Sequence, residues 1–155
     1  MSAGVRIDAP EIGELSSSQT GQMLREVANA MLTSAQLSFH NSSDPHGNKW
    51  PALSPKTIAK RRNNSDVPLR DTGVLMRSLQ VSDVFQSSEG MAIEAGSDME
   101  YASIHNFGGF AGKGKKAKIP QRQFMPDPDN LPEDITADIL DLGASVVMRS
   151  VFGNE

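Results

Sequence analysis

Three histidines and one nearby aspartate are the side chains in this sequence best suited to binding a metal ion. His40 and His46 stand six residues apart and flank Asp44 in a stretch rich in turn-forming residues. Zinc held on one face of a helix requires two histidines at i and i+4, which this spacing does not provide. A metal site at Asp44 and His46 would require His40 or His105 to fold back onto it. A metal-dependent hydrolase is therefore kept only as an alternative, and no metal ligand is assigned.

Acid–base and nucleophilic catalysis find little support in the other residues. His105 follows Tyr101 by four positions, so the two rings would be neighbours on a helix. Because no acid or base partner is fixed near His105 in the sequence, we expect it to hydrogen-bond the backbone or a neighbouring loop. The chain contains no cysteine, which excludes disulfides and thiolate catalysis, and it lacks a G-x-S-x-G nucleophile elbow. We predict no enzyme activity and no cofactor.

A glycine- and lysine-rich stretch from Gly109 to Lys116 resembles a phosphate-binding loop. It matches the pattern G-x-x-x-x-G-K but ends in Lys116, where a magnesium-binding serine or threonine is needed. No buried strand leads into it, and Pro120 blocks the helix whose N-terminus would hold the phosphates. Nucleotide hydrolysis is therefore not expected, and a solvated basic loop is the better interpretation.

Charge is unevenly distributed along the chain, whose net charge is −4. Seven bases and two acids lie between Lys49 and Arg77, and five bases and no acids lie between Lys113 and Arg122. Six acids and no bases lie between Asp127 and Asp141. Besides an uneven solvated surface, this polarity fits contact between neighbouring copies or a nucleic acid near the basic parts. The candidate contact residues are Lys113, Lys115, Lys116, Lys118, Asp134 and Asp138.

The length of 155 residues predicts one domain. Residues 1–17 mix polar and apolar side chains with a serine run, so we expect a flexible N-terminal segment, and residues 18–155 are expected to form the domain. The N-terminus lacks an apolar run and reads as neither a signal peptide nor a membrane span. Residues 108–118 hold four glycines and four lysines. They are predicted to form a mobile basic loop.

Two long helices should frame the domain. Apolar residues recur at helical spacing from about Ser18 to Phe39. A second helix is predicted from about Leu131 to Phe152, with Asn130 as its N-cap and Glu133 completing a capping box.

Short elements are expected between the two helices. Ser54-Pro55 should open a short basic helix, and Asp71 or Thr72 should cap another. Alternation from Val81 to Phe85 and from Met91 to Ala95 predicts a β-hairpin. The predicted class is α+β, a small antiparallel sheet packed against two long helices with extended loops.

Trp50 and Arg122 each allow two interpretations. Trp50 lies in a loop and could fill the core beneath it or anchor a neighbouring subunit. Arg122 lies in extended sequence between Pro120 and Phe124. It could make a bidentate contact across an interface or an exposed ion pair, which the sequence does not separate.

Four phrases in a fixed order give the chain a family resemblance. They are Gly-x-x-Trp-x-x-Leu-Ser-x-x-Thr, Thr-Gly-x-Leu-x-x-Ser-Leu, Tyr-Ala-x-Ile-His-x-Phe-Gly-Gly and Ile-Pro-x-Arg-x-Phe. Together they resemble the virion morphogenesis and tail completion family of contractile-tailed phages and prophages, over roughly Thr20 to Phe152. One departure is Met125-Pro126, where the family more often has a Leu-Gly type of continuation. The matching positions include Trp50, Leu53, Thr57, Thr72, Gly73, Leu75, Tyr101, His105, Gly108, Gly109, Pro120, Arg122 and Phe124.

This resemblance implies a non-enzymatic structural protein that completes the tail and supports head–tail joining. Related tail-terminator and neck proteins form rings, commonly hexamers, so the implied partners are copies of this chain, the tail tube and the neck or connector proteins. The implied location is the tail or neck of the virion, assembled in the host bacterial cytoplasm and without a membrane partner. One hypothesis is that the acidic C-terminal helix of one copy faces the Lys49–Arg77 region of the next. The Lys113–Lys118 loop would then face packaged DNA or a partner ring, and an electrostatic nucleic-acid-binding module is the alternative function.

Overall fold

A computed structural model describes residues 1–10 and 15–152, and at its centre lies an antiparallel sheet. Strand β4 (Gly90–Ser97) is the middle strand. On one side it pairs with β1 (Ala3–Pro10), and on the other it pairs with β2 (Leu79–Val81) and β3 (Phe85–Ser87). The hairpin predicted around residues 81–95 is therefore present. Its first strand is interrupted between β2 and β3, and the turn falls at Ser87 to Gly90.

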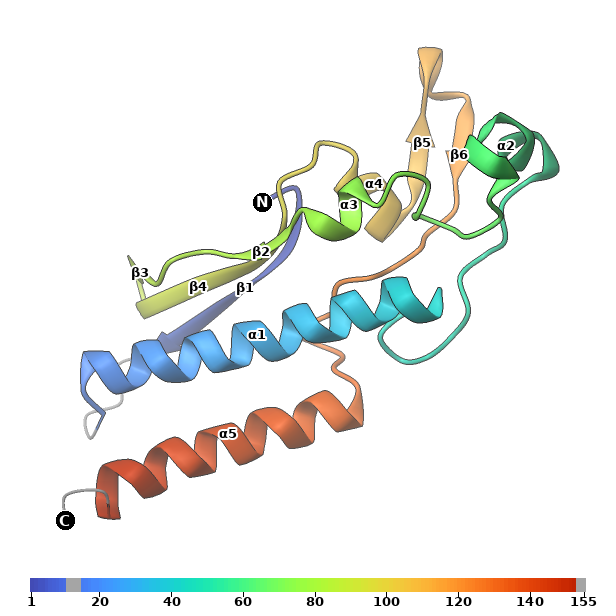
Figure 1. Ribbon diagram of the computed structural model, residues 1–155. Coiled ribbons are helices and arrows are strands. Elements are labelled where there is room, and N and C mark those ends of the chain that lie inside the picture. The colour runs from blue at the N-terminus through green and yellow to red at the C-terminus, as the bar shows by residue number, and fades with distance from the viewer. Residues whose placement is uncertain (11–14, 153–155) are drawn as a thin grey trace.

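Helix α1 (Ser17–Asn41) covers one face of this sheet, as Figure 1 shows. Ser16 caps its N-terminus, and Gln19 completes a capping box. The helix ends where Ser42 adopts a left-handed conformation, with φ of 50°. The apolar periodicity of the sequence thus predicted this helix to within two residues at each end. Its buried apolar side chains are Leu24, Val27, Ala28, Met31, Ala35 and Phe39.

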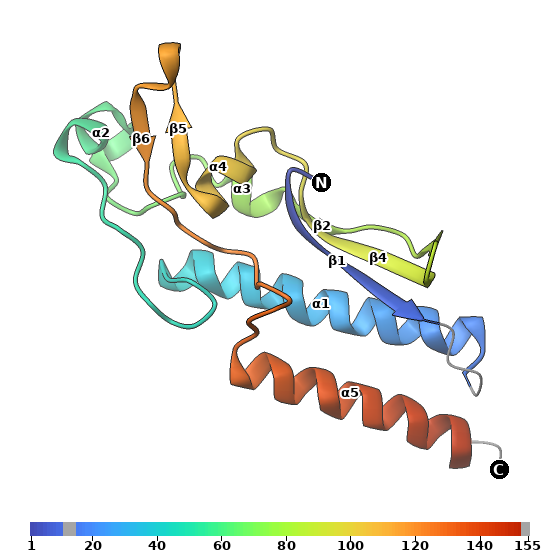
Figure 2. The same ribbon diagram turned by 180° about the vertical axis from the view of Figure 1, so that it is seen from behind.

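Helix α5 (Glu133–Phe152) forms a third layer. It packs on α1, on the side away from the sheet, in both views of the molecule (Figures 1 and 2). The α+β class is confirmed, but only one of the two long helices covers the sheet. The second difference is at the start of α5, because Asn130 is not its N-cap. The backbone N–H of Asn130 instead donates to the Asp127 carbonyl in a turn that precedes the helix.

The N-terminal segment expected to be flexible over residues 1–17 contains the edge strand β1. Its register with β4 runs without a break from Ala3 opposite Ser97 to Pro10 opposite Gly90. Ala3, Val5 and Ala9 are buried, and the positions between them alternate toward solvent. This alternation is the strand pattern. It was obscured by the proline, glycine and serines that follow it in residues 10–18.

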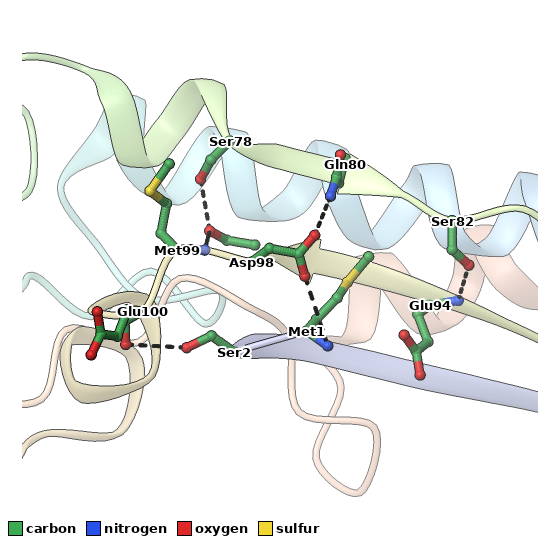
Figure 3. A network of polar contacts seen from close by, with 10 residues as sticks. Met1, Ser2, Ser78, Gln80, Ser82, Glu94, Asp98, Met99 and Glu100 are labelled. Atoms are coloured by element: carbon green, nitrogen blue, oxygen red, sulfur yellow. Dashed lines mark hydrogen bonds and ion pairs between the residues drawn. The ribbon is translucent and has the colours of Figure 1, made fainter.

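Polar contacts fasten the start of β1 to the end of β4. The N-terminal ammonium of Met1 lies 3.8 Å from an Asp98 oxygen, and the Ser2 hydroxyl donates to the Glu100 carbonyl. Dashed lines mark both contacts in Figure 3. The hydroxyls of Ser78 and Ser97 hydrogen-bond at 2.7 Å. These contacts join β1, β4 and the segment before β2 at one end of the sheet.

The stretch expected to be a mobile basic loop, residues 108–118, carries regular structure. Strands β5 (Gly109–Ala111) and β6 (Ala117–Ile119) pair antiparallel, and a short 3-10 turn, η2 (Lys113–Lys115), joins them. Gly112 and Gly114 have φ of 78° and 70°, so the glycines that suggested a linker instead permit the tight turn. Both views show this hairpin projecting away from the sheet and from α5 (Figures 1 and 2).

Four short helical segments complete the fold around the hairpin. Helix α2 (Pro55–Lys60) is capped by the Ser54 hydroxyl, as the Ser-Pro pair predicted, and η1 (Arg62–Asn64) follows it. The N-cap of helix α3 (Val74–Arg77) is Gly73 rather than Asp71 or Thr72. Helix α4 (Ala102–Phe107) leads directly into β5.

Candidate functional site

Trp50 fills the core below the loop that carries it. The residue is only 7% exposed, and its ring meets Phe39 edge-on, with centroids 5.7 Å apart. Phe39 in turn lies 5.0 Å from Phe124. The indole Nε1 donates to the Gln123 carbonyl at 2.8 Å. The indole therefore links α1, the Trp50 loop and the segment after β6, and it is not available to anchor a neighbouring subunit.

Arg122 joins the same segments from the other side. It is 5% exposed, and its Nε and Nη2 donate to the carbonyls of Pro51 and Ala52 at 2.9 and 3.1 Å. Burial, and then the nearby Arg61 guanidinium, lower the pKa of Arg122. Its partners are backbone carbonyls, and the described residues provide it with no carboxylate. Neither interpretation drawn from the sequence fits, because the hydrogen bonds of Arg122 join two loops within its own chain.

Asn106 completes this arrangement, and the sequence did not single it out. The residue is 2% exposed, and its Oδ1 accepts from the backbone N–H groups of Phe124 and Met125 at 2.9 and 3.0 Å. The available signal was its position four residues after Ala102, on the buried side of a short helix. Asn106 thus satisfies two donors that no strand partner pairs. We call Trp50, Arg122 and Asn106 with their backbone partners the loop clasp.

His105 lies beside the loop clasp, and one of its ring nitrogens lacks a hydrogen-bond partner among the described residues. Its backbone carbonyl accepts from the Arg122 N–H at 2.8 Å, and its ring meets Tyr101 at 6.1 Å between centroids. The buried ring atom Nδ1 has no hydrogen-bond partner among the described residues. Burial, followed by the charges of Arg122 and Arg61, lowers the pKa of His105. The expected hydrogen bond from this ring nitrogen is therefore not formed within the described part of the chain.

The Thr72 phrase meets the Tyr101 phrase across a small cavity of about 150 Å³. Thr72, Leu75, Tyr101 and His105 line it, together with Arg61. Gly73 has φ of 73°, and Arg77 Nη2 donates to the Thr72 carbonyl at 2.9 Å, which closes the turn before α3. The second and third phrases therefore meet in space, next to the loop clasp.

The remaining signature residues shape the turns that lead to this region. Gly108 has φ of 73°, and a Cβ there would lie 2.9 Å from the Gln121 nitrogen, so the hairpin base leaves no room for a side chain. Thr57 is exposed, and its hydroxyl lies 2.8 Å from that of Ser54 at the start of α2. Leu53, Gly109 and Pro120 are half-buried.

The histidine cluster considered for a metal does not assemble in the described residues. His46 Nε2 lies 3.0 Å from the Asn130 carbonyl, and His40 is exposed on α1. The Asp44 carboxylate accepts from the backbone N–H and the amide of Asn48, which closes its own turn. Among residues 1–10 and 15–152, no group of three acidic, histidine or cysteine side chains is placed to hold a metal ion.

Two surfaces of opposite charge lie at separate places on the molecule. The lysine hairpin is β5–β6 with its exposed residues Lys113, Lys115, Lys116 and Lys118. The acidic groove is a cavity of about 340 Å³ between α1 and α5, lined in part by Asp44, Asp134 and Asp138. Both lie outside the loop clasp, so the signature residues and the charged candidate residues form distinct regions.

Several basic side chains between Lys49 and Arg77 already donate hydrogen bonds to backbone carbonyls of their own chain. Lys49 Nζ donates to the Asn41 carbonyl at 2.7 Å, and Arg61 and Arg77 donate to the carbonyls of Val67 and Thr72. Lys56 and Lys60 on α2 are exposed. The basic region that the sequence pairs with an acidic helix is therefore only partly available to a partner.

Among the described helices, none is both long enough and apolar enough to cross a bilayer. No solved structure matches the chain. A Mu-like prophage FluMu G protein 2 of Haemophilus influenzae (strain ATCC 51907 / DSM 11121 / KW20 / Rd) is 30% identical over 119 residues, which are 77% of this chain and 75% of that protein. The profile of the phage virion morphogenesis family matches residues 11–142, which include every one of the four phrases. The chain therefore belongs to the phage virion morphogenesis family.

Proposed function

We propose that this protein is a structural tail completion protein of the tail-terminator or neck type. It forms a ring of copies, a hexamer, on the tail tube and supports the joining of the tail to the DNA-filled head. The observation that carries the proposal is the family match over residues 11–142. The four phrases described above lie in this range in their expected order. The proposed partners are the tail tube and the neck or connector proteins, and the proposed location is the tail or neck of the virion.

The buried side chains of the loop clasp support a structural role. The polar groups of Trp50, Arg122 and Asn106 bond to backbone atoms of their own chain, and they hold loops that are far apart in the sequence. A catalytic group must instead reach a substrate with an ionisable or nucleophilic atom. These residues fix shape, and shape is what an assembly protein must reproduce in each copy of a ring.

The exposed aromatic side chains supply contact surface for such a ring. Phe107 and Phe110 at the base and first strand of the hairpin are 62% and 59% exposed. Tyr101 and Val74 are also exposed. Large aromatic side chains contribute much of the energy of protein interfaces. Their exposure in the isolated chain fits a protein whose surface is completed by partners.

A deletion in the phage or prophage tests the function. We expect lysates without this protein to contain filled heads and tails that are not joined, visible by electron microscopy, and expression of the protein in trans should restore infectious particles. Normal infectious particles without the protein would contradict the proposal. Light scattering and electron microscopy of the purified protein test the ring separately from the role in the particle.

A nucleic-acid-binding module is the second candidate, favoured by the four lysines on the projecting hairpin. Contacts from such lysines to phosphates would be electrostatic and independent of sequence. A gel shift of the purified protein with duplex DNA, weakening steeply as salt increases, would support this candidate. Absence of a shift at 50 mM salt, about the lower end of the range where such contacts are strong, would exclude it.

A further inference from the structure

The acidic groove contains more than a cluster of carboxylates. Its cavity of about 340 Å³ is lined by Asp134 and Asp138 of α5 and by Leu37 and Ser38 of α1. Ser38 is 2% exposed, and its buried hydroxyl oxygen has no hydrogen-bond partner among the described residues. Asp134 and Asp138 form no ion pair within the described part of the chain. Native structures rarely leave a buried hydroxyl without a partner, and this one belongs to a residue in the wall of the groove.

The chemistry of this groove fits a lysine side chain. The carboxylates of Asp134 and Asp138 accept hydrogen bonds from an ammonium group, which carries three donors. Leu37 forms part of the wall and is 53% exposed, so it can cover the methylene stem of a lysine. A metal ion fits less well, because no three acidic or histidine side chains of the described residues come close enough to share one.

The lysine hairpin offers such side chains in the right chemical setting. Its four lysines are exposed and form no ion pair within the described residues. Phe107 and Phe110 beside them are exposed as well, so the hairpin combines charge with apolar contact area. The bases Lys49, Arg61 and Arg77, in contrast, donate to carbonyls of their own chain. The hairpin is therefore the better available cationic surface.

The hairpin cannot fill the groove of its own chain in this fold. Figures 1 and 2 both show β5 and β6 projecting on one side of α1, whereas α5 lies on the other side. A contact between the two surfaces must therefore join different copies. Because the two surfaces differ, the contact is heterologous, and repeating it closes a ring or extends a filament.

We propose that the lysine hairpin of one copy docks into the acidic groove between α1 and α5 of the next copy. This inference rests on the proposed ring function and names the two surfaces that would build it. The hairpin then serves assembly rather than DNA contact. At the partner groove, lysine ammonium groups meet Asp134 and Asp138, and the lysine stems lie against Leu37.

Charge reversal on each surface tests this contact. One variant carries Asp134→Lys and Asp138→Lys, and the other carries Lys113→Glu, Lys115→Glu and Lys116→Glu. In sedimentation velocity at low salt, each variant alone should associate about a hundredfold more weakly than the wild type, because like charges then face each other. Mixing the two variants should restore association, because the basic hairpin of the groove variant fits the acidic groove of the hairpin variant, and the acidic hairpin fits the basic groove. The two variants should therefore alternate in assemblies as large as those of the wild type.

A variant that carries all five reversals provides the sharper readout. Its groove is basic and its hairpin is acidic, so association of identical copies should return. The matched control carries Lys56→Glu and Lys60→Glu on α2, exposed lysines outside the proposed contact, and should associate like the wild type. Circular dichroism confirms that every variant retains its helical content.

The outcomes separate this inference from the ring proposal. If the wild type associates and both charge-reversal variants associate equally well, the hairpin contact is wrong but the ring is not contradicted. The same conclusion follows if association is lost in the α2 control instead. A wild type that stays monomeric at all concentrations tested contradicts the ring and this contact together. Failure of the five-reversal variant to associate, while its fold is intact, also contradicts the inference.

Cysteine cross-linking provides an independent measurement, because the chain contains no cysteine of its own. A variant with Leu37→Cys and Lys115→Cys should form disulfide-linked ladders between copies under mild oxidation. The control with Leu37→Cys and Lys56→Cys should remain largely uncross-linked. Equal ladders in both variants would contradict the proposed contact.

Discussion

Buried polar side chains at the loop clasp illustrate how single residues determine the shape of this protein. Arg122 keeps its charge although it is almost fully buried, because two carbonyl oxygens accept its hydrogen bonds. Removing such a residue leaves those carbonyls without a partner and costs more than the bonds themselves contribute. Trp50 and Asn106 follow the same logic with neutral donors and acceptors. These three residues are therefore structural in the strict sense that each satisfies backbone groups of a distant loop.

The indole N–H of Trp50 can be separated from its ring by substitution. Trp50→Phe keeps an aromatic ring against Phe39 but leaves the Gln123 carbonyl without its donor, so the unfolding free energy should fall by about 1–3 kcal/mol. Trp50→Ala also leaves a cavity and should cost about 3–5 kcal/mol. Urea titration measures the two losses in unfolding free energy. Unfolding is followed by circular dichroism, because both variants lack the chain's single tryptophan and cannot be followed by its fluorescence. Phe110→Ala at an exposed site is the control, and equal losses in all three variants would contradict the argument.

His105 should make stability depend on pH in a defined direction. Burial, with Arg122 and Arg61 close by, lowers its pKa in the folded state, whereas the unfolded chain has the ordinary value of about 6.5. Below about pH 6.5 the unfolded state therefore binds more protons, and the free energy of unfolding falls as pH decreases until the folded pKa is passed. His105→Gln should lose less stability than the wild type between pH 7.5 and pH 5. His40→Gln, at an exposed site, is the control, and an unchanged pH dependence in His105→Gln would contradict this assignment.

At the scale of elements, hydrophobic periodicity and capping residues predicted the helices better than the strands. The stripe of apolar residues predicted α1, and Ser54-Pro55 predicted the start of α2. Strand β1 was missed because eight residues next to proline and serines carry a weak pattern, and their burial depends on pairing with β4, which follows them by at least eighty positions. The hairpin β5–β6 was missed because glycine-rich composition fits both a linker and a tight turn.

The sequence predicted most residues of the candidate site but not the hydrogen bonds that join them. The four phrases named Trp50 and Arg122, and the charge pattern named the hairpin lysines and the acids of α5. Sequence did not show that Arg122 bonds to the carbonyls of Pro51 and Ala52, since any residue offers a carbonyl. Asn106 was missed for the same reason, because its partners are backbone N–H groups. Contacts to the backbone leave little trace in side-chain types.

Gly108 tests the geometry at the base of the hairpin. With φ of 73° and a Cβ position 2.9 Å from the Gln121 nitrogen, Gly108→Ala meets both backbone strain and a steric clash with the main chain. We expect a loss of about 2–4 kcal/mol in the free energy of unfolding, since strain alone costs about 1–3 kcal/mol. Gly47→Ala is the matched control, because Gly47 also has positive φ, of 87°, but open space around its Cβ position. Thermal unfolding compares the two, and equal losses would show that the clash has no effect.

At the scale of the whole molecule, three layers share one central helix. The sheet and α5 lie on opposite sides of α1, so α5 is held mainly by a single neighbour (Figure 1). Ile135 is the buried anchor of that contact, and Ile139 is partly buried beside it. Elements with few buried contacts open at lower free energy than the core. The helix that forms one wall of the acidic groove is therefore the layer that opens most easily in the isolated chain.

Hydrogen exchange should reveal this order and connect it to assembly. Amides in residues 133–143 should exchange faster than those of β4 and of the buried half of α1, and Ile135→Ala should accelerate exchange in α5 while leaving β4 unchanged. Equal exchange rates in α5 and β4 of the isolated chain would contradict this order of stability.

Assembly should change the exchange of α5 more than that of any other element. If a hairpin from a second copy docks between α1 and α5, it adds contacts to the weakly held layer, so assembly should slow exchange in residues 133–143 more than elsewhere. Mass spectrometry of the wild type at low salt, compared with the variant that carries Asp134→Lys and Asp138→Lys, measures this difference. Protection that appears in α2 on assembly, rather than in α5, would contradict the coupling between the groove and the ring.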